Sequence, residues 1–301
     1  MLTDLRPAFK VMILMSILLV LGVLTAAGSG EDMQIDKYGE KMILLFKILQ
    51  VVAVIFIFIL PAGLFSLLFT KDRLRYPRWN VPPNLILLLI GALVFIVGIP
   101  MIAWLEQLNR EMTLPASLSG LEHWMQQSEA NAGKLTEAFL ADTSVGGLIL
   151  NLFVIAFMAA LSEELFFRGV LQKAFTEAFG NYHVAIWVTA ILFSAFHMQF
   201  YGFVPRMIMG AVLGYLFVWS GSLWVNIFAH FVNNGVAVVI SWMIKRGSIT
   251  EEMQNGPVTI SAVSGLISLA LVAGLMFLVF KFRKKEEEPA LMQTPPEQVQ
   301  P

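Results

Sequence analysis

The residues of this 301-residue chain that could do chemistry lie in the apolar stretches of its second half. An ionisable side chain inside a membrane helix costs about 2.5–3.5 kcal/mol on insertion scales, so such residues indicate a functional site. A carboxylate can act as a general base toward water, and hydrogen-bond donors can stabilise an oxyanion in a low-dielectric site. The residues concerned are Glu163, Glu164, Arg168, His197, His230 and Asn234.

Helix geometry sorts these residues into pairs. Glu164 and Arg168 are four residues apart with the glutamate first, which is the favourable order for an ion pair along one face. Considered by itself, this pair can be explained as a purely structural ion pair. Glu163 is rotated by about 100° from Glu164, because about 3.6 residues make a turn, and it therefore lacks a cation on its own helix. His230 and Asn234 are again four residues apart, so both can point at one target.

The depths of these residues in the membrane also agree. Gly180 and Asn181 are typical of a turn between two helices, and Gly180 lies 17 residues after Glu163 and 17 before His197. At about 1.5 Å per residue, both side chains lie about 25 Å from the turn in an antiparallel helix pair. A single intramembrane histidine is often only a hydrogen-bonding group between helices. Convergence of all these residues on one level predicts a functional site.

The elements that must position these residues are membrane-spanning helices. Hydrophobic residues make up 57% of the chain and charged residues 14%, with a mean hydropathy of +0.75, whereas soluble domains carry about a quarter charged residues. Since a span takes about 20 apolar residues, we expect an all-α integral membrane protein, a polytopic bundle of about eight transmembrane helices. The net charge of −1 gives no basis for binding nucleic acid, and the absence of cysteine excludes disulfides and thiolate sites. The expected spans are 9–27, 43–69, 85–105, 145–161 and beyond, 183–196, 203–219, 223–244 and 260–280.

The polar segments between the spans predict the topology. They divide the chain into an N-terminal three-helix membrane region (1–105), an extracytoplasmic loop (106–144), a helical core (145–244), a loop with the last span (245–280) and a disordered cytoplasmic tail (281–301). With the N-terminus inside, the cytoplasmic side holds 12 Lys and Arg residues and the other side seven, which favours both termini in the cytoplasm. Leu121, Trp124 and Met125 have the spacing of an interfacial helix within the long loop.

Two features of the first spans need separate interpretation. Residues 9–27 could be a cleaved signal peptide, but we expect an uncleaved helix because the apolar run is long and seven spans follow. Pro61 predicts a kink in the second span, since proline removes a helical hydrogen bond.

Three motifs in the second half resemble those of the CPBP family of intramembrane proteases, which includes type II CAAX prenyl proteases and Abi-like bacteriocin-processing or bacteriocin-immunity proteins. The family's first motif is two glutamates, three residues and an arginine, which residues 163–168 match. Its second is phenylalanine, three residues and histidine, matched by 193–197, and its third is histidine, three residues and asparagine or aspartate, matched by 230–234. Each motif alone is weak, but the ordered trio is specific, and the resemblance covers residues 145–242.

The resemblance implies a membrane-embedded endopeptidase. Carried over to this sequence, Glu163 activates the attacking water and His197 helps to hold it, while His230 and Asn234 donate hydrogen bonds to the oxyanion. Glu164 and Arg168 are then supporting residues. These groups suffice for a glutamate mechanism without a cofactor. A metalloprotease stays open, because a glutamate and two histidines could bind Zn²⁺ and leave a position for water.

The resemblance leaves the substrate open beyond a membrane-associated protein or peptide in a lipid bilayer. The expected location is the bacterial plasma membrane. The alternative function is that of a non-catalytic bacteriocin-immunity or scaffold protein of the same family. An ion-coupled transporter is less favoured, because no internal repeat is visible.

The predicted topology also suggests how a substrate reaches the site. Gly180 and Gly221 lie in turns on the cytoplasmic side, and His230 follows Gly221 by nine residues, about 14 Å along a helix. We therefore expect a site wetted from the cytoplasm. The helices before Val145 are expected to form a separate group, which leaves a seam for an extended segment of the substrate. The 106–144 loop is expected on the other side and is expected to play no catalytic part.

Overall fold

The computed structural model describes residues 39–71, 75–248 and 261–283, together with positions 6, 7, 10 and 14. Over these residues the chain is helical and has no strand, which confirms the predicted fold class. Apart from positions 10 and 14, the first expected span (9–27) lies outside the described residues, and so does the tail after residue 283. Each of the seven other expected spans has a helical counterpart.

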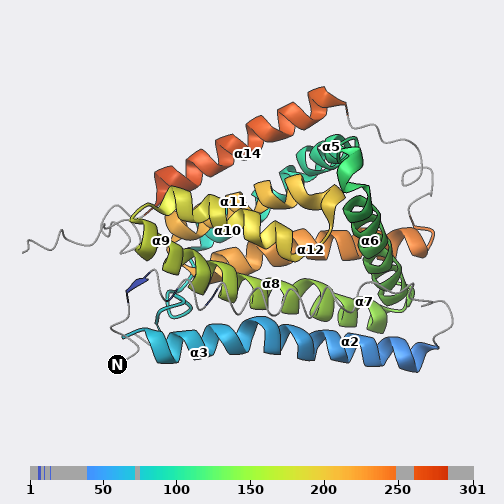
Figure 1. Ribbon diagram of the computed structural model, residues 1–301, viewed down its shortest axis with the longest axis horizontal. Coiled ribbons are helices and arrows are strands. Elements are labelled where there is room, and N and C mark those ends of the chain that lie inside the picture. The colour runs from blue at the N-terminus through green and yellow to red at the C-terminus, as the bar shows by residue number, and fades with distance from the viewer. Residues whose placement is uncertain are drawn as a thin grey trace, which may run out of the picture.

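Most helices run along the long axis of the molecule, and α6 lies across one end of them (Figure 1). Five helices are long and apolar enough to cross a membrane, and the bent pair of α4 and α5 makes a sixth. The expected fifth span is α10, which has only 15 residues. The described residues thus support five or six spans, and the expected number of eight is not confirmed.

The bounds of the elements are as follows. The helices before the core are α2 (Glu40–Val54), η3 (Ile55–Ile59), α3 (Leu60–Phe69), α4 (Leu85–Val97), α5 (Ile99–Arg110), η4 (Ala116–Leu118) and α6 (Ser119–Phe139). The next long helix consists of α7 (Val145–Asn151), η5 (Leu152–Met158), α8 (Ala159–Glu163), η6 (Glu164–Gln172) and α9 (Lys173–Phe179). It is followed by α10 (Tyr182–Phe196), η7 (Phe200–Gly202), α11 (Phe203–Ser220), α12 (Leu223–Lys245) and α14 (Ala262–Phe282).

The helix from α2 to α3 passes Pro61 without a break. It is one helix of 30 residues, and the π-helical turn η3 comes just before the proline. A π-helical turn shifts the hydrogen-bond ladder by one residue, which accommodates the N–H that proline lacks. The irregularity predicted at Pro61 is therefore a local change of helix type.

The helix expected over 85–105 is bent by 44° between α4 and α5. Gly98 joins the two parts, and Pro100 follows at the start of α5. Ser268 on α14 bridges the break, because its hydroxyl donates to the carbonyl of Val97 at 2.6 Å and accepts from the N–H of Met101 at 3.2 Å. Backbone groups freed in a membrane helix must find such partners, since lipid offers none.

Glycines on α11 let it approach its neighbours closely. A Cβ at Gly214 would lie 2.8 Å from Ile186 on α10 and 2.9 Å from Gln172 on η6, and one at Gly210 would lie 3.3 Å from Ala190. Real Cβ contacts are longer, so a larger residue at either position would push the helices apart. Small residues at helix contacts are typical of membrane proteins.

The helices before Val145 do not form a separate group, contrary to our expectation. On α3's side of the molecule, the Phe58 ring packs at 5.7 Å from both Phe166 and Phe167 of η6. On the other side, α4 packs on α12, where a Cβ at Gly91 would lie 3.5 Å from Ala229. Helices of the first half therefore pack on two sides of the second half.

Two turns at one end of the bundle are built as the sequence predicts. Gly180 and Gly221 end α9 and α11 in the left-handed conformation, with φ of 63° and 68°, where glycine carries little steric penalty. The Asn181 side chain then caps α10 by accepting from the N–H groups of His183 and Val184. In Figure 1 this end lies opposite α6.

The fold predicts which exposed positions lie on opposite sides of the membrane. Arg75 belongs to the basic segment at the Gly221 end, and Gly133 lies on the exposed face of α6. On this cysteine-free background, we expect Arg75→Cys to react with an impermeant thiol reagent only from the cytoplasm and Gly133→Cys only from outside. Labelling of both cysteines from the same side would contradict the fold, and the reverse pattern would contradict the predicted orientation.

Candidate active site

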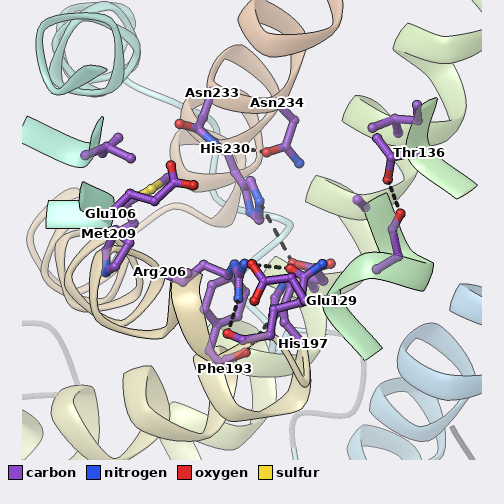
Figure 2. Close-up of a pocket in the computed structure, with 18 of the residues that line it drawn as sticks. Glu106, Glu129, Thr136, Phe193, His197, Arg206, Met209, His230, Asn233 and Asn234 are labelled. Carbon is purple, nitrogen blue, oxygen red and sulfur yellow. Dashed lines mark hydrogen bonds and ion pairs between the residues drawn. The ribbon is translucent and has the colours of Figure 1, made fainter. Parts of the chain in front are cut away.

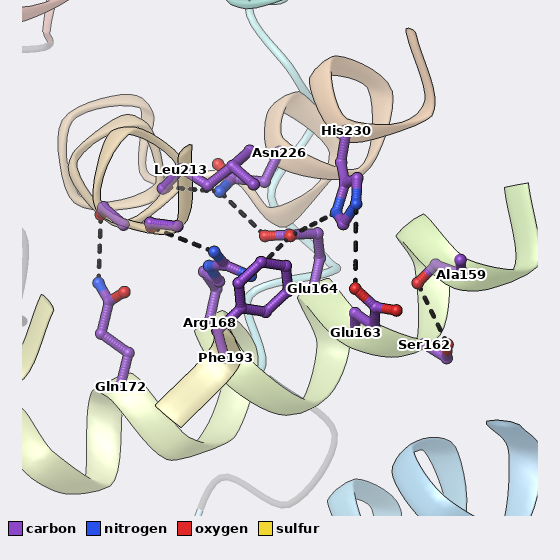
Figure 3. Close-up of polar contacts among 12 residues, drawn as sticks. Ala159, Ser162, Glu163, Glu164, Arg168, Gln172, Phe193, Leu213, Asn226 and His230 are labelled. Carbon is purple, nitrogen blue, oxygen red and sulfur yellow. Dashed lines mark hydrogen bonds and ion pairs between the residues drawn. The ribbon is translucent and has the colours of Figure 1, made fainter. Parts of the chain in front are cut away.

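A fully buried carboxylate, Glu164, lies at the centre of the candidate site (Figure 3). It accepts a hydrogen bond from Arg168 at 2.8 Å, within η6, and from the Asn226 amide of α12 at 3.2 Å. His230, one turn further along α12, places Nδ1 2.8 Å from the same carboxylate. Burying a charge is tolerated only when it is paired and hydrogen-bonded, and Glu164 meets both conditions.

Arg168 is fully buried as well and joins a third helix to the network. Its guanidinium donates to the carbonyl of Gly210 on α11 at 3.1 Å and lies 4.5 Å from the centre of the Phe193 ring on α10. A cation over an aromatic face is favourable, most of all when it is desolvated. The predicted ion pair of Glu164 and Arg168 is therefore present, and it connects four segments of the core.

Glu163 has a different environment, although it is the adjacent residue. Its side chain keeps 14% of its exposure, whereas that of Glu164 is fully buried. Its Oε2 atom accepts no hydrogen bond from the described residues and lies 3.9 Å from Nε2 of His230. The rotation of about 100° between neighbouring helical residues explains this divergence. It turns one carboxylate into the core and the other toward open space.

The two histidines each use Nδ1 to fix the ring and direct Nε2 elsewhere. Nδ1 of His197, just beyond the end of α10, lies 2.8 Å from the carbonyl oxygen of Phe193. A carbonyl can only accept, so this nitrogen carries the proton, and Nε2 is the lone-pair atom of the neutral ring. The ring of His197 also packs on Phe193, with centroids 5.0 Å apart.

Two amides of α12 extend the polar surface beyond His230. Asn233 donates from Nδ2 to Oδ1 of Asn234 at 3.0 Å. This bond occupies the carbonyl end of the Asn234 amide, so its N–H₂ group stays available as a donor. Figure 2 shows both amides beside His230 at the edge of a cavity.

The predicted residues meet at that cavity, whose volume is about 580 Å³. Glu163, His197, His230 and Asn234 all line it, so the shared level deduced from the Gly180 turn is observed. Glu164 and Arg168 do not line it; they lie behind the reactive residues, as expected for support.

Residues of the 106–144 segment line this cavity, so the segment contributes to the walls of the site although no catalytic part is predicted for it. Its helix α6 has 21 residues and crosses the end of the bundle (Figure 1). Glu129 of α6 accepts from the N–H of Tyr201 at 3.2 Å, and Gln126 donates to the Tyr201 hydroxyl at 2.8 Å. The α6 residues that line the cavity are Glu129, Ala132, Leu135, Thr136 and Phe139.

The cavity extends from Glu163 toward the α6 end of the bundle. Arg206 lies there and donates from two nitrogens to the backbone oxygen and side-chain oxygen of Gln199, at 3.3 and 2.6 Å. Glu106 and Glu129 line the same part. The residues of the Gly180 and Gly221 turns do not line it. This lining gives no support to the expected access from the Gly180 end, because its polar residues continue toward the opposite end.

Sequence reasoning missed three residues of the site: Asn226, Asn233 and Arg206. Asn226 lies four residues before His230, so its place on the same helix face could have been found from spacing. Asn233 could have been found as the neighbour of Asn234. No sequence signal places Arg206, because its position depends on its hydrogen bonds to Gln199 in the segment between α10 and α11.

A metal site would need several His, Cys, Asp or Glu side chains close together. Within the described parts of the chain, no three His, Cys, Asp or Glu side chains gather in a way that could hold a metal ion. The described residues therefore give no support to the zinc site that the motifs allow, and we derive no step through a metal.

The buried network predicts an asymmetry between two similar ion pairs. Glu164–Arg168 and Glu106–Arg110 both have four-residue spacing and an N–O distance of 2.8 Å, but the first is fully buried and the second exposed. Arg168→Ala should lower the free energy of unfolding by about 3–5 kcal/mol, because it leaves a buried charge unpaired. Arg110→Ala should cost about 0.5 kcal/mol or less.

The measurement is the amount of folded protein in the membrane and its thermal unfolding in detergent. Glu164→Ala should behave as Arg168→Ala does. Equal behaviour of the Arg168 and Arg110 variants would show that the buried pair does not stabilise the fold.

Comparison with known proteins identifies the segment that carries this site. Residues 145–236 match the family described as type II CAAX prenyl endopeptidase Rce1-like. The uncharacterized protein YpbD of Bacillus subtilis (strain 168) is 26% identical over 117 residues, which cover 38% of this chain and 55% of YpbD. The chain thus spans about half the length of that curated relative, and no solved structure matches. The resemblance predicted from the three motifs is confirmed by the match of residues 145–236 to the Rce1-like family.

Proposed function

We propose that this chain is an intramembrane endopeptidase that hydrolyses a peptide bond of a membrane-associated protein or peptide. The observation that carries the proposal is one cavity in which an under-bonded carboxylate, Glu163, faces two imidazoles and an amide donor. An unpaired carboxylate is expensive to bury, so its retention favours a chemical role. The match to an endopeptidase family over the same residues supports this function.

The proposed reaction begins with a water between Glu163 and His197. Glu163 takes a proton from the water as general base, and the lone pair on Nε2 of His197 accepts a hydrogen bond that orients it. The resulting hydroxide attacks the carbonyl carbon of the substrate. His230 and Asn234 donate hydrogen bonds to the oxygen on which negative charge develops, in a site largely shielded from bulk water.

The surroundings of the cavity fit a substrate at the membrane. Apolar spanning helices surround the site, and we propose the bacterial plasma membrane as its location, with both termini in the cytoplasm. The cavity lining then runs toward the outer face, where α6 contributes to it. A substrate segment must be unwound to expose its carbonyl, and the amide of Asn234 offers its backbone a polar partner that lipid lacks.

The proposal predicts that Glu163→Gln abolishes cleavage while the protein still inserts and accumulates. The amide has nearly the same shape as the carboxylate but cannot take a proton from water. The measurement compares new N-termini in membrane proteomes of cells with the wild-type chain and with the variant. Termini that disappear in the variant identify the substrate and the cleaved bond.

Glu106→Gln is the matched control, because Glu106 lines the same cavity at its far end. It should leave the set of new N-termini unchanged. Identical termini in wild type, Glu163→Gln and a deletion strain would contradict the enzyme and favour the immunity or scaffold function.

A second prediction concerns the oxyanion donor. Asn234→Leu should slow cleavage about 10²–10³-fold, the usual effect of removing one such donor. Asn233→Leu should have a smaller effect, about tenfold, because Asn233 only fixes the orientation of its neighbour. The rates are measured on a peptide containing the bond identified by proteomics. A larger loss in Asn233→Leu than in Asn234→Leu would reverse this assignment.

A further inference from the structure

The hydrogen bonds around His230 determine where its protons lie. Glu164 accepts from Arg168 and Asn226, so its carboxylate is ionised and can only accept. Nδ1 of His230, 2.8 Å from that carboxylate, must therefore be the donor. Nε2 is the nitrogen directed at Glu163, at 3.9 Å from its Oε2 atom. Any donation by His230 into the site thus requires a second proton, on Nε2.

The partners of the two site histidines differ in charge. His197 donates from Nδ1 to a neutral carbonyl, whereas His230 donates to an anionic carboxylate. A carboxylate stabilises a charged imidazolium far more than a carbonyl does, above all where water is excluded. The two rings therefore suit opposite tasks, with His197 accepting from water through Nε2 and His230 donating from Nε2.

The charge balance of the buried cluster points the same way. Glu163 and Glu164 bring two negative charges, and Arg168 brings one positive charge to the same network. A second proton on His230 makes the cluster neutral, whereas a neutral ring leaves one buried negative charge uncompensated, which is costly. The other cation that lines the cavity, Arg206, interacts with Glu129 and Glu106 at the α6 end first, and with Glu163 only after them.

We propose that His230 carries protons on both nitrogens in the resting site and acts as the general acid that protonates the leaving amine. This inference rests on the proposed peptidase function and changes the task of His230 within it. Asn234 then remains as the donor that holds the oxyanion.

The proton transfers balance over one cycle. Glu163 takes a proton from water as the water oxygen bonds to the carbonyl carbon, whose π electrons move to its oxygen. When the tetrahedral intermediate collapses, the C–N bond breaks and the departing nitrogen takes the Nε2 proton of His230. Glu163 then returns its proton to Nε2, 3.9 Å from its Oε2 atom, through a bridging water, which restores both groups. The products are a carboxylic acid and an amine.

The test uses a variant that keeps a donor but removes the acid. The side chain of His230→Gln can donate a hydrogen bond, but it cannot transfer a proton to the substrate. The substrates are a peptide with the bond identified by proteomics and its thioester analogue at the same bond. A thiol has a pKa of about 8.5, so it leaves as a thiolate without needing a proton.

We expect His230→Gln to slow amide hydrolysis by about 10²–10⁴-fold, the usual contribution of general acid–base catalysis, and thioester hydrolysis by less than about tenfold. Equal losses on both substrates would overturn the proposal in favour of an oxyanion or structural role. Unchanged rates on both would overturn it as well. Glu163→Gln serves as a separate arm, because full activity of that variant would refute the peptidase function itself.

A measurement without substrate keeps the proposal testable if the variant does not fold. The chain has four histidines, so its imidazole ¹⁵N resonances in lipid can be assigned with His123→Gln, His183→Gln and His197→Gln variants. We expect both nitrogens of His230 to be protonated near neutral pH and those of His197 to show a neutral ring. A neutral His230 ring would overturn the proposal.

Discussion

The rest of the structure depends on the burial of one carboxylate, that of Glu164. Its negative charge is stable only because partners from η6 and α12 donate to it at the same time, while Arg168 also reaches α11. Each partner is in turn fixed by helix packing, so the network holds the helices in one arrangement. Loss of any partner exposes the full cost of a buried charge. This is why the reactive residues in front of it have defined positions within a membrane.

Two adjacent residues of one helix have different tasks in the site, one structural and one reactive. Glu164 and Glu163 are identical in chemistry and adjacent in sequence, yet one has three hydrogen-bonding partners and the other has an oxygen without any. The same division appears along α12, where Asn226 faces the core and Asn234 faces the cavity. The rotation between residues of one helix therefore places stabilising and reactive groups side by side, and no additional helix is needed to carry them.

Features that follow from helix geometry alone could be predicted from the sequence. The Glu164–Arg168 pair, the shared face of His230 and Asn234, and the common level of Glu163 and His197 all depend on the rise and turn of a helix, and all are observed. Features that depend on contacts between distant segments could not be predicted. The bend at Gly98 depends on Ser268, and the place of α6 beside the cavity depends on its bonds to Tyr201. The expectation about access depends on the second kind of feature.

The contact of Ser268 with the bent helix has a consequence for how the protein could be divided. Ser268 lies on α14, well beyond the Rce1-like segment, while Val97 and Met101 lie well before it. A chain cut down to residues 145–236 would lose both sides of this contact and the α4 surface on which α12 packs. A chain lacking only α14 would leave a broken helix with a free carbonyl and a free N–H facing hydrocarbon. The segment that carries the site is therefore not an independent unit. Moving it into another membrane protein would require a new hydrogen-bonding partner for every polar group that the flanking helices now pair.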